Sequence, residues 1–288
     1  MNVRWYVKSS FLLILISVPL YCDYKGSDLA QYSKPPILFV HGYGMKASGW
    51  EKMISSLKAS GYPPLFLRAV QLYPDTGGNI RAAEEQIASA IERFLDKVNT
   101  ELRSKAPSLV PKTKVDIVAH SMGALSARWY AAKLRPDRVR VWISLGGANH
   151  GTDVLCKFLG QGARDCCPAY SDSGIQYDLN GLPFKPDVDE TPYGMGQDSP
   201  GVTTIPPDSA RAIFYFSIRT SPDNWIKPET SPILDGAGGC HIPIPSDLPC
   251  LETSPGNFLM TNGVGHDQML EDAAVIDLVK TILSAIDR

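Results

Sequence analysis

The segment VDIVAHSMGALSARWY, from Val115 to Tyr130, decides the fold class of this 288-residue chain. Its first four residues, up to Val118, are mostly β-branched and apolar and predict a buried strand, and helix-forming residues follow Ser121. A serine at a sharp turn between a strand and a helix is the arrangement of a nucleophile elbow. Such a turn lifts the serine hydroxyl out of the sheet and aims the first N–H groups of the helix toward a developing oxyanion.

The usual elbow pattern is Gly-x-Ser-x-Gly, and Ala119 stands here in the first glycine position. The position needs a small residue because the strand and the helix nearly touch, and alanine meets that need. As a bare pentapeptide the match is weak, and a serine in an ordinary strand–helix turn is the alternative. The strand before Ser121 and the helix after it favour a nucleophile, which still needs a base to become reactive.

Composition limits the classes of function. A net charge of −2 and the absence of a basic stripe argue against a nucleic-acid partner. The hydrophobic content of 44% is ordinary for a globular protein, and 288 residues suit one generous α/β domain or two small ones.

The first 22 residues form a separate unit. Arg4 and Lys8 precede an uncharged run from Ser9 to Cys22 with an apolar centre, which is typical of a secretory signal peptide. The run is short for a membrane-spanning helix, which needs about 20 apolar residues, and an uncleaved anchor or a buried first helix is the alternative. Cys22 stands where a bacterial lipoprotein is cut and acylated, but the two residues before it fit the usual lipobox poorly. We therefore expect a secreted or cell-envelope protein, with lipid anchoring at Cys22 as an alternative.

Export permits disulfide bonds. Cys240 and Cys250 bracket a proline-rich loop that a disulfide would close. Cys156 is expected to bond one of the adjacent pair Cys166 and Cys167, which leaves one thiol over, although spacing does not decide the connectivity. A zinc site is the rival explanation, but the sequence has no Cys-x-x-Cys pair with matching histidines, so we expect no metal.

Strand and helix signals alternate from Pro36 onward, which predicts βαβ units around a mostly parallel sheet. Expected strands cover residues 37–40, 64–70, 115–118, 139–145 and 212–218. Expected helices cover residues 48–60, 79–104, 122–134 and 269–286. Residues 23–288 are therefore predicted to form a single α/β domain.

Residues 149–211 interrupt this pattern. After the strand ending near Leu145 the regular signals stop, and the segment holds seven prolines and the acidic run Pro186 to Glu190. A long irregular insertion at the carboxyl edge of an α/β sheet is usually functional, so we predict a lid-like cover stapled by a disulfide. A decorative surface loop is the alternative. The acidic run offers carboxylate ligands for structural calcium, but a solvated loop is the better explanation, and no cofactor is expected.

Acyl transfer by a serine needs a base and a carboxylate that orients it, and in an elbow fold the chain order is serine, acid, histidine. His266 lies in the glycine-rich loop NGVGHD just before the last expected helix, where a loop can carry it to the elbow. Its alternative role, capping that helix, suits Asp267 better. The other histidines fit less well because they precede the elbow, follow it too closely or lie inside the Cys240–Cys250 loop: His41, His120, His150 and His241.

The acid is expected directly after the strand at 212–218. The loop RTSPDN, residues 219–224, carries Asp223 as its first carboxylate. There it would hold the tautomer of His266 and stabilise the imidazolium without taking a proton itself. Asp235 is the runner-up, and a simple turn-forming role is the alternative for Asp223.

A His-Gly turn, HGYG at residues 41–44, follows the first expected strand. Backbone N–H groups in such a turn can face the site, and we predict the N–H groups of Tyr43 and Met122 as the oxyanion donors. His41 itself is expected to be a structural hydrogen-bonding residue rather than a catalyst.

Four segments together resemble bacterial lipases of the α/β-hydrolase superfamily: HGYG (41–44), AHSMG (119–123), LGGAN (145–149) and GVGH (263–266). The Ala-x-Ser-x-Gly variant is similar to that of the small Bacillus-type lipases and the wider class 2 group. The resemblance covers most of the chain from about residue 35, and Ser121, Asp223 and His266 match the family's triad. The longer insertion and the paired cysteines depart from the smallest members.

The resemblance implies hydrolysis of triacylglycerols or other carboxylic esters through an acyl-enzyme, without a cofactor, on a lipid or ester substrate. A thioesterase or a hydroxyalkanoate polyester depolymerase is the alternative that uses the same elbow. A non-catalytic surface binding protein on a hydrolase scaffold is the alternative from another class.

Overall fold

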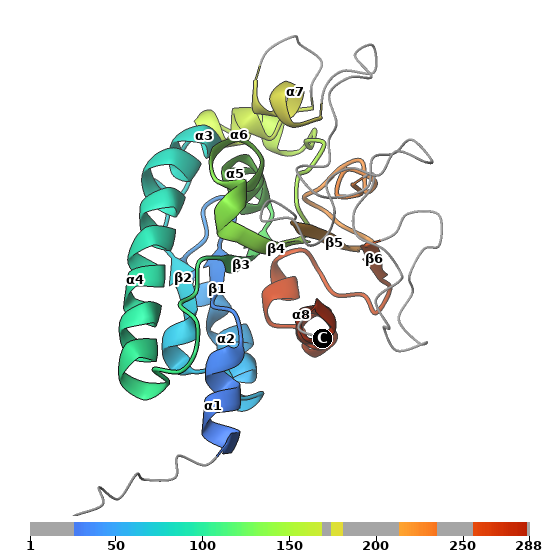
Figure 1. The fold of residues 1–288 in the computed structure, drawn as a ribbon. Helices are drawn as coiled ribbons and strands as arrows, with labels where there is room; N and C mark the ends of the chain where they lie inside the picture. Colours follow the sequence, from blue (N-terminus) through green and yellow to red (C-terminus); the bar gives the residue numbers. More distant parts are fainter. Residues whose placement is uncertain (1–25, 169–173, 181–212, 235–255, 287–288) are drawn as a thin grey trace, which may run out of the picture.

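The computed structural model describes residues 26–168, 174–180, 213–234 and 256–286, in which helices flank a central sheet (Figure 1). Six strands pair in parallel in this part of the chain, in the order β2-β1-β3-β4-β5-β6. Their bounds are Ile37–Val40 (β1), Leu67–Val70 (β2), Val115–His120 (β3), Val139–Leu145 (β4), Phe214–Thr220 (β5) and Asn257–Met260 (β6). The predicted α/β class with a mostly parallel sheet is confirmed.

Several predictions concern residues outside these ranges and stay predictions. They are the signal segment 1–22, the acidic run 186–190, the Cys240–Cys250 bond and the runner-up acid Asp235. None of the described helices is long and apolar enough to cross a membrane.

Alternate residues of the strands supply two apolar cores, one on each face of the sheet. In β1, Leu38 and Val40 pack on the face covered by α4 (Ala88–Lys105). Ile37 and Phe39 pack on the opposite face, against α2 (Glu51–Ala59) and α8 (Ala273–Ile286) (Figure 1). All four side chains are fully buried, and each such burial contributes about 1.5–3 kcal/mol. β1 is therefore held between the two cores.

The expected helices are present, but several are built from consecutive shorter pieces. The bounds are Ala47–Trp50 (η1) then α2; Asn79–Arg81 (α3), Ala82–Ile87 (η3, a π-helix) then α4; Met122–Trp129 (α5) then Tyr130–Leu134 (η4, a π-helix); and Asp267–Leu270 (η7) then α8.

The expected strand 64–70 is too long, because Pro64–Phe66 forms a 3-10 turn (η2) and β2 begins only at Leu67. Prolines at 63 and 64 cannot donate to a strand ladder, which explains the late start. The sequence pattern did not predict β6 or two further elements, Gly26–Ser33 (α1) and Pro136–Arg138 (η5).

The insertion was expected to be loop-rich, and its described part holds three short helical elements. It contains Leu155–Lys157 (η6), Gln161–Asp165 (α6) and Ile175–Asn180 (α7). Elements of this length are too short to show a helical period in the sequence. They cover the end of the sheet near α5 (Figure 1).

A disulfide joins Cys156 to Cys167, and Cys166 is a free, buried thiol. The prediction that Cys156 bonds one of the adjacent pair is confirmed. Cys166 packs into a small apolar cluster with Met122 and Leu155, and burial raises the pKa of its thiol. The disulfide therefore closes a loop within the insertion, while Cys166 packs the insertion against the start of α5.

Candidate active site

The elbow lies at the carboxyl end of β3, in the middle of the sheet. Ser121 has φ +54° and ψ −128°, between the last residue of β3 and the first residue of α5. Apart from glycines, it is the one described residue with a positive φ, and holding such a conformation costs roughly 1–3 kcal/mol. A strained backbone conformation persists only where the surrounding structure enforces it, and such conformations are concentrated at functional sites.

Gly123 allows the helix to approach the sheet. A Cβ atom at this position would lie 2.2 Å from the carbonyl oxygen of His41, so α5 touches the end of β1 backbone to backbone. Only glycine fits such a contact. Ala119, where the usual pattern has glycine, is fully buried in β3 and is accommodated as alanine.

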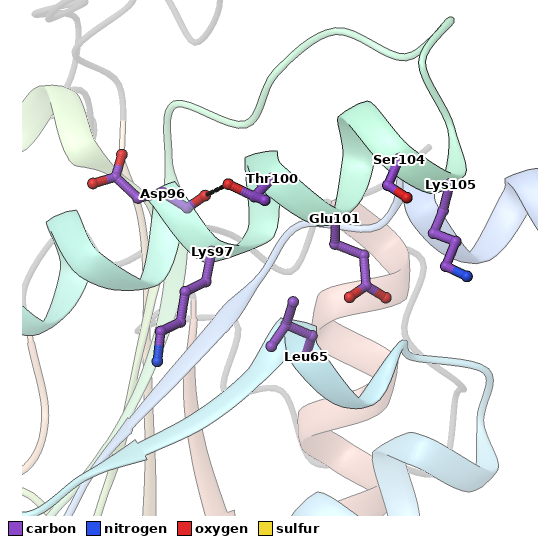
Figure 2. A pocket seen from close by; sticks show the side chains of 7 residues that line it. All are labelled: Leu65, Asp96, Lys97, Thr100, Glu101, Ser104 and Lys105. Carbon is purple, nitrogen blue, oxygen red and sulfur yellow. Dashed lines mark hydrogen bonds between the residues drawn. The ribbon is translucent and has the colours of Figure 1, made fainter.

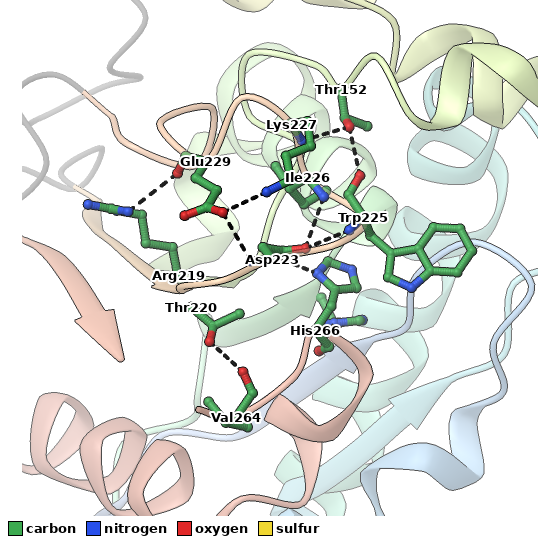
Figure 3. A network of polar contacts seen from close by, with 11 residues as sticks. Thr152, Arg219, Thr220, Asp223, Trp225, Ile226, Lys227, Glu229, Val264 and His266 are labelled. Atoms are coloured by element: carbon green, nitrogen blue, oxygen red, sulfur yellow. Dashed lines mark hydrogen bonds and ion pairs between the residues drawn. The ribbon is translucent and has the colours of Figure 1, made fainter. Parts of the chain in front are cut away.

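His266 and Asp223 form a buried pair. Nδ1 of His266 lies 2.9 Å from Oδ2 of Asp223, and both side chains are almost fully buried (Figure 3). The other carboxylate oxygen, Oδ1, accepts hydrogen bonds from the backbone N–H groups of Trp225 at 2.8 Å and Ile226 at 2.9 Å. The carboxylate therefore receives the hydrogen on Nδ1 and leaves Nε2 of His266 available as a base.

Two hydrogen bonds hold the loop that carries His266. The hydroxyl of Thr220, at the end of β5, donates to the carbonyl oxygen of Val264 at 2.5 Å. Nε2 of His120, the last residue of β3, donates to the carbonyl oxygen of His266 at 3.0 Å. The His266 loop is thus tied to β5, which leads to Asp223, and to β3, which leads to Ser121.

Ser121 and His266 line one cavity of about 310 Å³ at the carboxyl ends of the strands, where α/β folds place their sites. Its remaining walls come from Tyr43, Gly44, Met45, Leu155, Trp225 and Asp267. In the described residues no hydrogen bond joins Ser121 to His266, and such contacts are often long before substrate binds.

The predicted oxyanion donors face this region from two sides. Met122 is the first residue of α5, where helix N–H groups lack internal partners. Tyr43 follows β1 in the turn that lines the cavity. Within the described residues, neither backbone N–H has a hydrogen-bond partner. Both are therefore available to a ligand oxygen.

Residues 36–181, half of the chain, match the family model described as palmitoyl protein thioesterase. The chain belongs to this family. Members of the palmitoyl protein thioesterase family are hydrolases, as predicted for this chain. The match includes the elbow and the His-Gly turn and ends before Asp223 and His266.

Among solved structures, lipase B of Aspergillus fumigatus is 15% identical, with a TM-score of 0.53 over 88% of this chain and 54% of that one. The thioesterase-family chain thus spans about half the length of that lipase. Bacillus licheniformis lipase BlEst2 in its mature form is 18% identical, with a TM-score of 0.48 over 87% and 92% of the two chains. The α/β-hydrolase fold is confirmed, whereas the specific likeness to Bacillus-type lipases stays a prediction.

The acid loop of this thioesterase-family member contains a carboxylate that sequence reasoning missed. Glu229 accepts hydrogen bonds from Lys227 Nζ at 2.6 Å, the Ser221 hydroxyl at 2.7 Å and the backbone N–H of Asp223 at 3.4 Å (Figure 3). The bonds from Lys227 and Ser221 lower the pKa of Glu229 to about 2. Glu229 therefore closes the loop around Asp223 as a permanent anion.

Thr152 connects the insertion to the acid loop, and this contact was also missed. Its hydroxyl donates to the carbonyl oxygen of Trp225 at 2.7 Å and accepts the backbone N–H of Lys227 at 3.0 Å. The insertion thus holds the loop that positions Asp223. A lone threonine in an irregular segment carries no signal that would reveal this contact.

Two further histidines lie near the site and stay neutral. Burial lowers the pKa of His41, opposed by a hydrogen bond to Gly42 and by the charge of Asp75. Burial lowers the pKa of His120 further, and the neighbouring His266 ring, 4.6 Å away between centroids, adds to this. Among the described residues, neither of these two histidines forms a hydrogen bond with Asp223.

Another cavity, of about 390 Å³, lies between α4 and η2 (Figure 2). It is lined by Leu65, Asp96, Lys97, Thr100, Glu101, Ser104 and Lys105. Its lining has neither histidine nor cysteine, so it does not offer the serine–histidine pair found in the first cavity. In the described residues, the one cluster with metal-ligand spacing is His120, His266 and Asp267, which belongs to the elbow site itself.

Proposed function

We propose that the protein is a serine hydrolase that cleaves carboxylic esters through an acyl-enzyme, as a lipase or esterase. The observation that carries the proposal is the cavity shared by a strained serine and a histidine paired with a buried aspartate. A nucleophile, a base and a group that orients the base are the parts that acyl transfer needs.

In the proposed mechanism, Oγ of Ser121 attacks the ester carbonyl while Nε2 of His266 takes its proton. Asp223 stabilises the imidazolium, and the N–H groups of Tyr43 and Met122 hold the tetrahedral oxyanion. His266 then protonates the departing alcohol, which leaves the acyl group on Ser121. Water, deprotonated by His266, attacks the acyl-enzyme and releases the carboxylic acid.

An apolar acyl group suits the walls of the cavity. Leu155, Met45 and Trp225 line it, and Phe158 bridges the rings of Tyr43 and Trp225 at centroid distances of 6.3 and 5.8 Å. Phe158 is 42% exposed and Leu159 91% exposed, so the apolar surface continues outward from the cavity. These features support a lipid or fatty ester as substrate.

Thioester hydrolysis is the second candidate, and the family match favours it. The same groups would act, with a thiol as the leaving group. A thiol is a better leaving group than an alcohol and depends less on the proton from His266. Loss of that proton transfer would therefore harm oxygen esters more than thioesters.

The protein is further proposed to act outside the cytoplasm. The signal-like segment 1–22 and the disulfide between Cys156 and Cys167 support this, because disulfides persist in oxidising compartments. Detection of processed protein in the medium or envelope fraction of the source cells tests it, and retention of the unprocessed chain in the cytoplasm would contradict it.

Labelling with a fluorophosphonate probe tests the proposed chemistry. Wild type should be labelled and Ser121→Ala should not, with kcat falling by about 10⁴-fold or more. A panel of p-nitrophenyl esters of different length, emulsified triglyceride, acyl-CoA and polyester film then separates the substrate classes. Folded wild-type protein that is not labelled refutes the serine hydrolase, and turnover of polyester film alone refutes the lipase or esterase assignment.

A further inference from the structure

His41 is fully buried at the end of β1, and both of its ring nitrogens have partners. Nε2 lies 3.0 Å from the backbone nitrogen of Leu72 and 3.1 Å from the side-chain nitrogen of Gln71. A backbone N–H can only donate, so Nε2 accepts and carries no hydrogen. The hydrogen is therefore on Nδ1, which donates to the carbonyl oxygen of Gly42 at 2.9 Å.

The carbonyl group of Gly42 and the N–H group of Tyr43 belong to the same peptide unit. In a planar trans peptide these two groups point in opposite directions. Nδ1 of His41 and the backbone N–H of Met45, at 3.2 Å, hold the carbonyl on one side. The N–H of Tyr43 must then point to the other side, and it has no hydrogen-bond partner among the described residues.

This peptide lies directly against the elbow. A Cβ atom on Gly42 would lie 2.8 Å from Cβ of Ser121 and 3.1 Å from Nδ1 of His120. Tyr43 lines the same cavity as Ser121. An oxygen bound to the carbon that Ser121 attacks would therefore come within reach of the Tyr43 N–H.

We propose that His41 is a positioning residue whose Nδ1–H fixes the Gly42–Tyr43 peptide, so that the Tyr43 N–H is aimed at the oxyanion. The inference rests on the proposed acyl-transfer function. The bond to the carbonyl also polarises the peptide, which strengthens the N–H as a donor by roughly 10–30%. Burial lowers the pKa of His41, consistent with a neutral ring of fixed tautomer.

Two substitutions separate the bonds of the ring. In His41→Asn, the side-chain amide can replace Nδ1, which keeps the donor to Gly42 and loses the acceptor for Leu72. In His41→Gln, the longer side chain can replace Nε2, which keeps the acceptor for Leu72 and loses the donor to Gly42. Each variant removes the imidazole and retains one bond, so the two are matched controls.

We expect His41→Gln to lose about 10- to 100-fold in kcat with KM changed less than about twofold, because a misaimed donor costs somewhat less than a deleted one. His41→Asn should retain most of kcat. Affinity for a trifluoromethyl ketone, which forms an oxyanion on Ser121, should fall in His41→Gln by the same factor as kcat. Affinity for the matching unreactive alcohol should not change.

Equal losses of kcat in the two variants, in proportion to their loss of thermal stability, would overturn the proposal in favour of a purely structural role. Nitrogen-15 NMR of wild type provides a measurement that does not depend on a variant folding. It should show the Nδ1–H tautomer for His41, and the Nε2–H tautomer overturns the proposal. Absence of fluorophosphonate labelling in wild type would instead refute the proposed function.

Discussion

Asp223→Asn tests the assignment of the acid, because the structure dictates which way the new amide must face. Oδ1 accepts two backbone N–H groups, from Trp225 and Ile226. The amide oxygen has to stay at that position, since an NH₂ group there would meet two donors. The NH₂ group therefore takes the place of Oδ2, 2.9 Å from Nδ1 of His266.

A donor at this position forces Nδ1 of His266 to accept, so the ring hydrogen moves to Nε2. Nε2 then cannot take the proton of Ser121. Loss of the correct tautomer is expected to lower kcat by about 10⁴-fold, or about 5 kcal/mol in the activation barrier. The retained bonds at Oδ1 should keep the fold intact.

The assay is hydrolysis of p-nitrophenyl butyrate at neutral pH, with thermal unfolding to verify the fold of each variant. Asp235→Asn is the matched control, since Asp235 is the other acid that the sequence allows, and it should retain wild-type kcat. Asp223 is not the acid if folded Asp223→Asn keeps more than about a tenth of wild-type kcat, or if Asp235→Asn shows the large loss instead.

Three further predictions concern stability and thiol chemistry. His41 and His120 are held neutral with lowered pKa values, so the unfolded state binds more protons below about pH 6.5, and the free energy of unfolding should fall between about pH 7.5 and pH 5.5. Urea titrations measure this, and equal stability at both pH values would contradict it. Arg140→Met removes the two-pronged ion pair, 2.8 and 2.5 Å, from the fully buried Asp116, and should cost about 3–5 kcal/mol. Chemical denaturation tests this, and a loss within experimental error would exclude a stabilising role for the pair. Iodoacetamide should leave Cys166 unmodified until denaturant is added, because its thiol is buried and its pKa is raised; rapid labelling of folded protein would show otherwise.

The sheet was predictable from local sequence, and the pairing of His266 with Asp223 was predictable from chain order. β1 is four consecutive buried apolar residues, and the turn between β3 and α5 has a serine and a glycine two positions apart, Ser121 and Gly123. The order rule then selected His266, and the structure places its ring against Asp223 across 43 positions of sequence. The turn at Ser121 was predicted from its motif and His266 from its place in the chain order, and neither prediction needed knowledge of tertiary contacts.

The supporting contacts were not predictable, because they join irregular segments far apart in the chain. Thr152 meets Trp225 across 73 positions, and neither residue belongs to a periodic pattern. The choice of Cys167 over Cys166 depends on the path of the backbone just after α6, which places Cys166 in the buried cluster with Met122 and Leu155. The sequence shows that two adjacent cysteines follow α6, but it does not show which of the two side chains points toward Cys156.

The separation of the elbow from its base along the chain has a consequence during synthesis. His120, next to the elbow, and His266 are 146 positions apart. At roughly 5–20 residues per second, a ribosome needs on the order of ten seconds or more to add His266 after Ser121 has been made. Under the proposed function, a nascent or prematurely terminated chain that ends before His266 would carry Ser121 without the histidine proposed to activate it, and would therefore be inactive as a hydrolase.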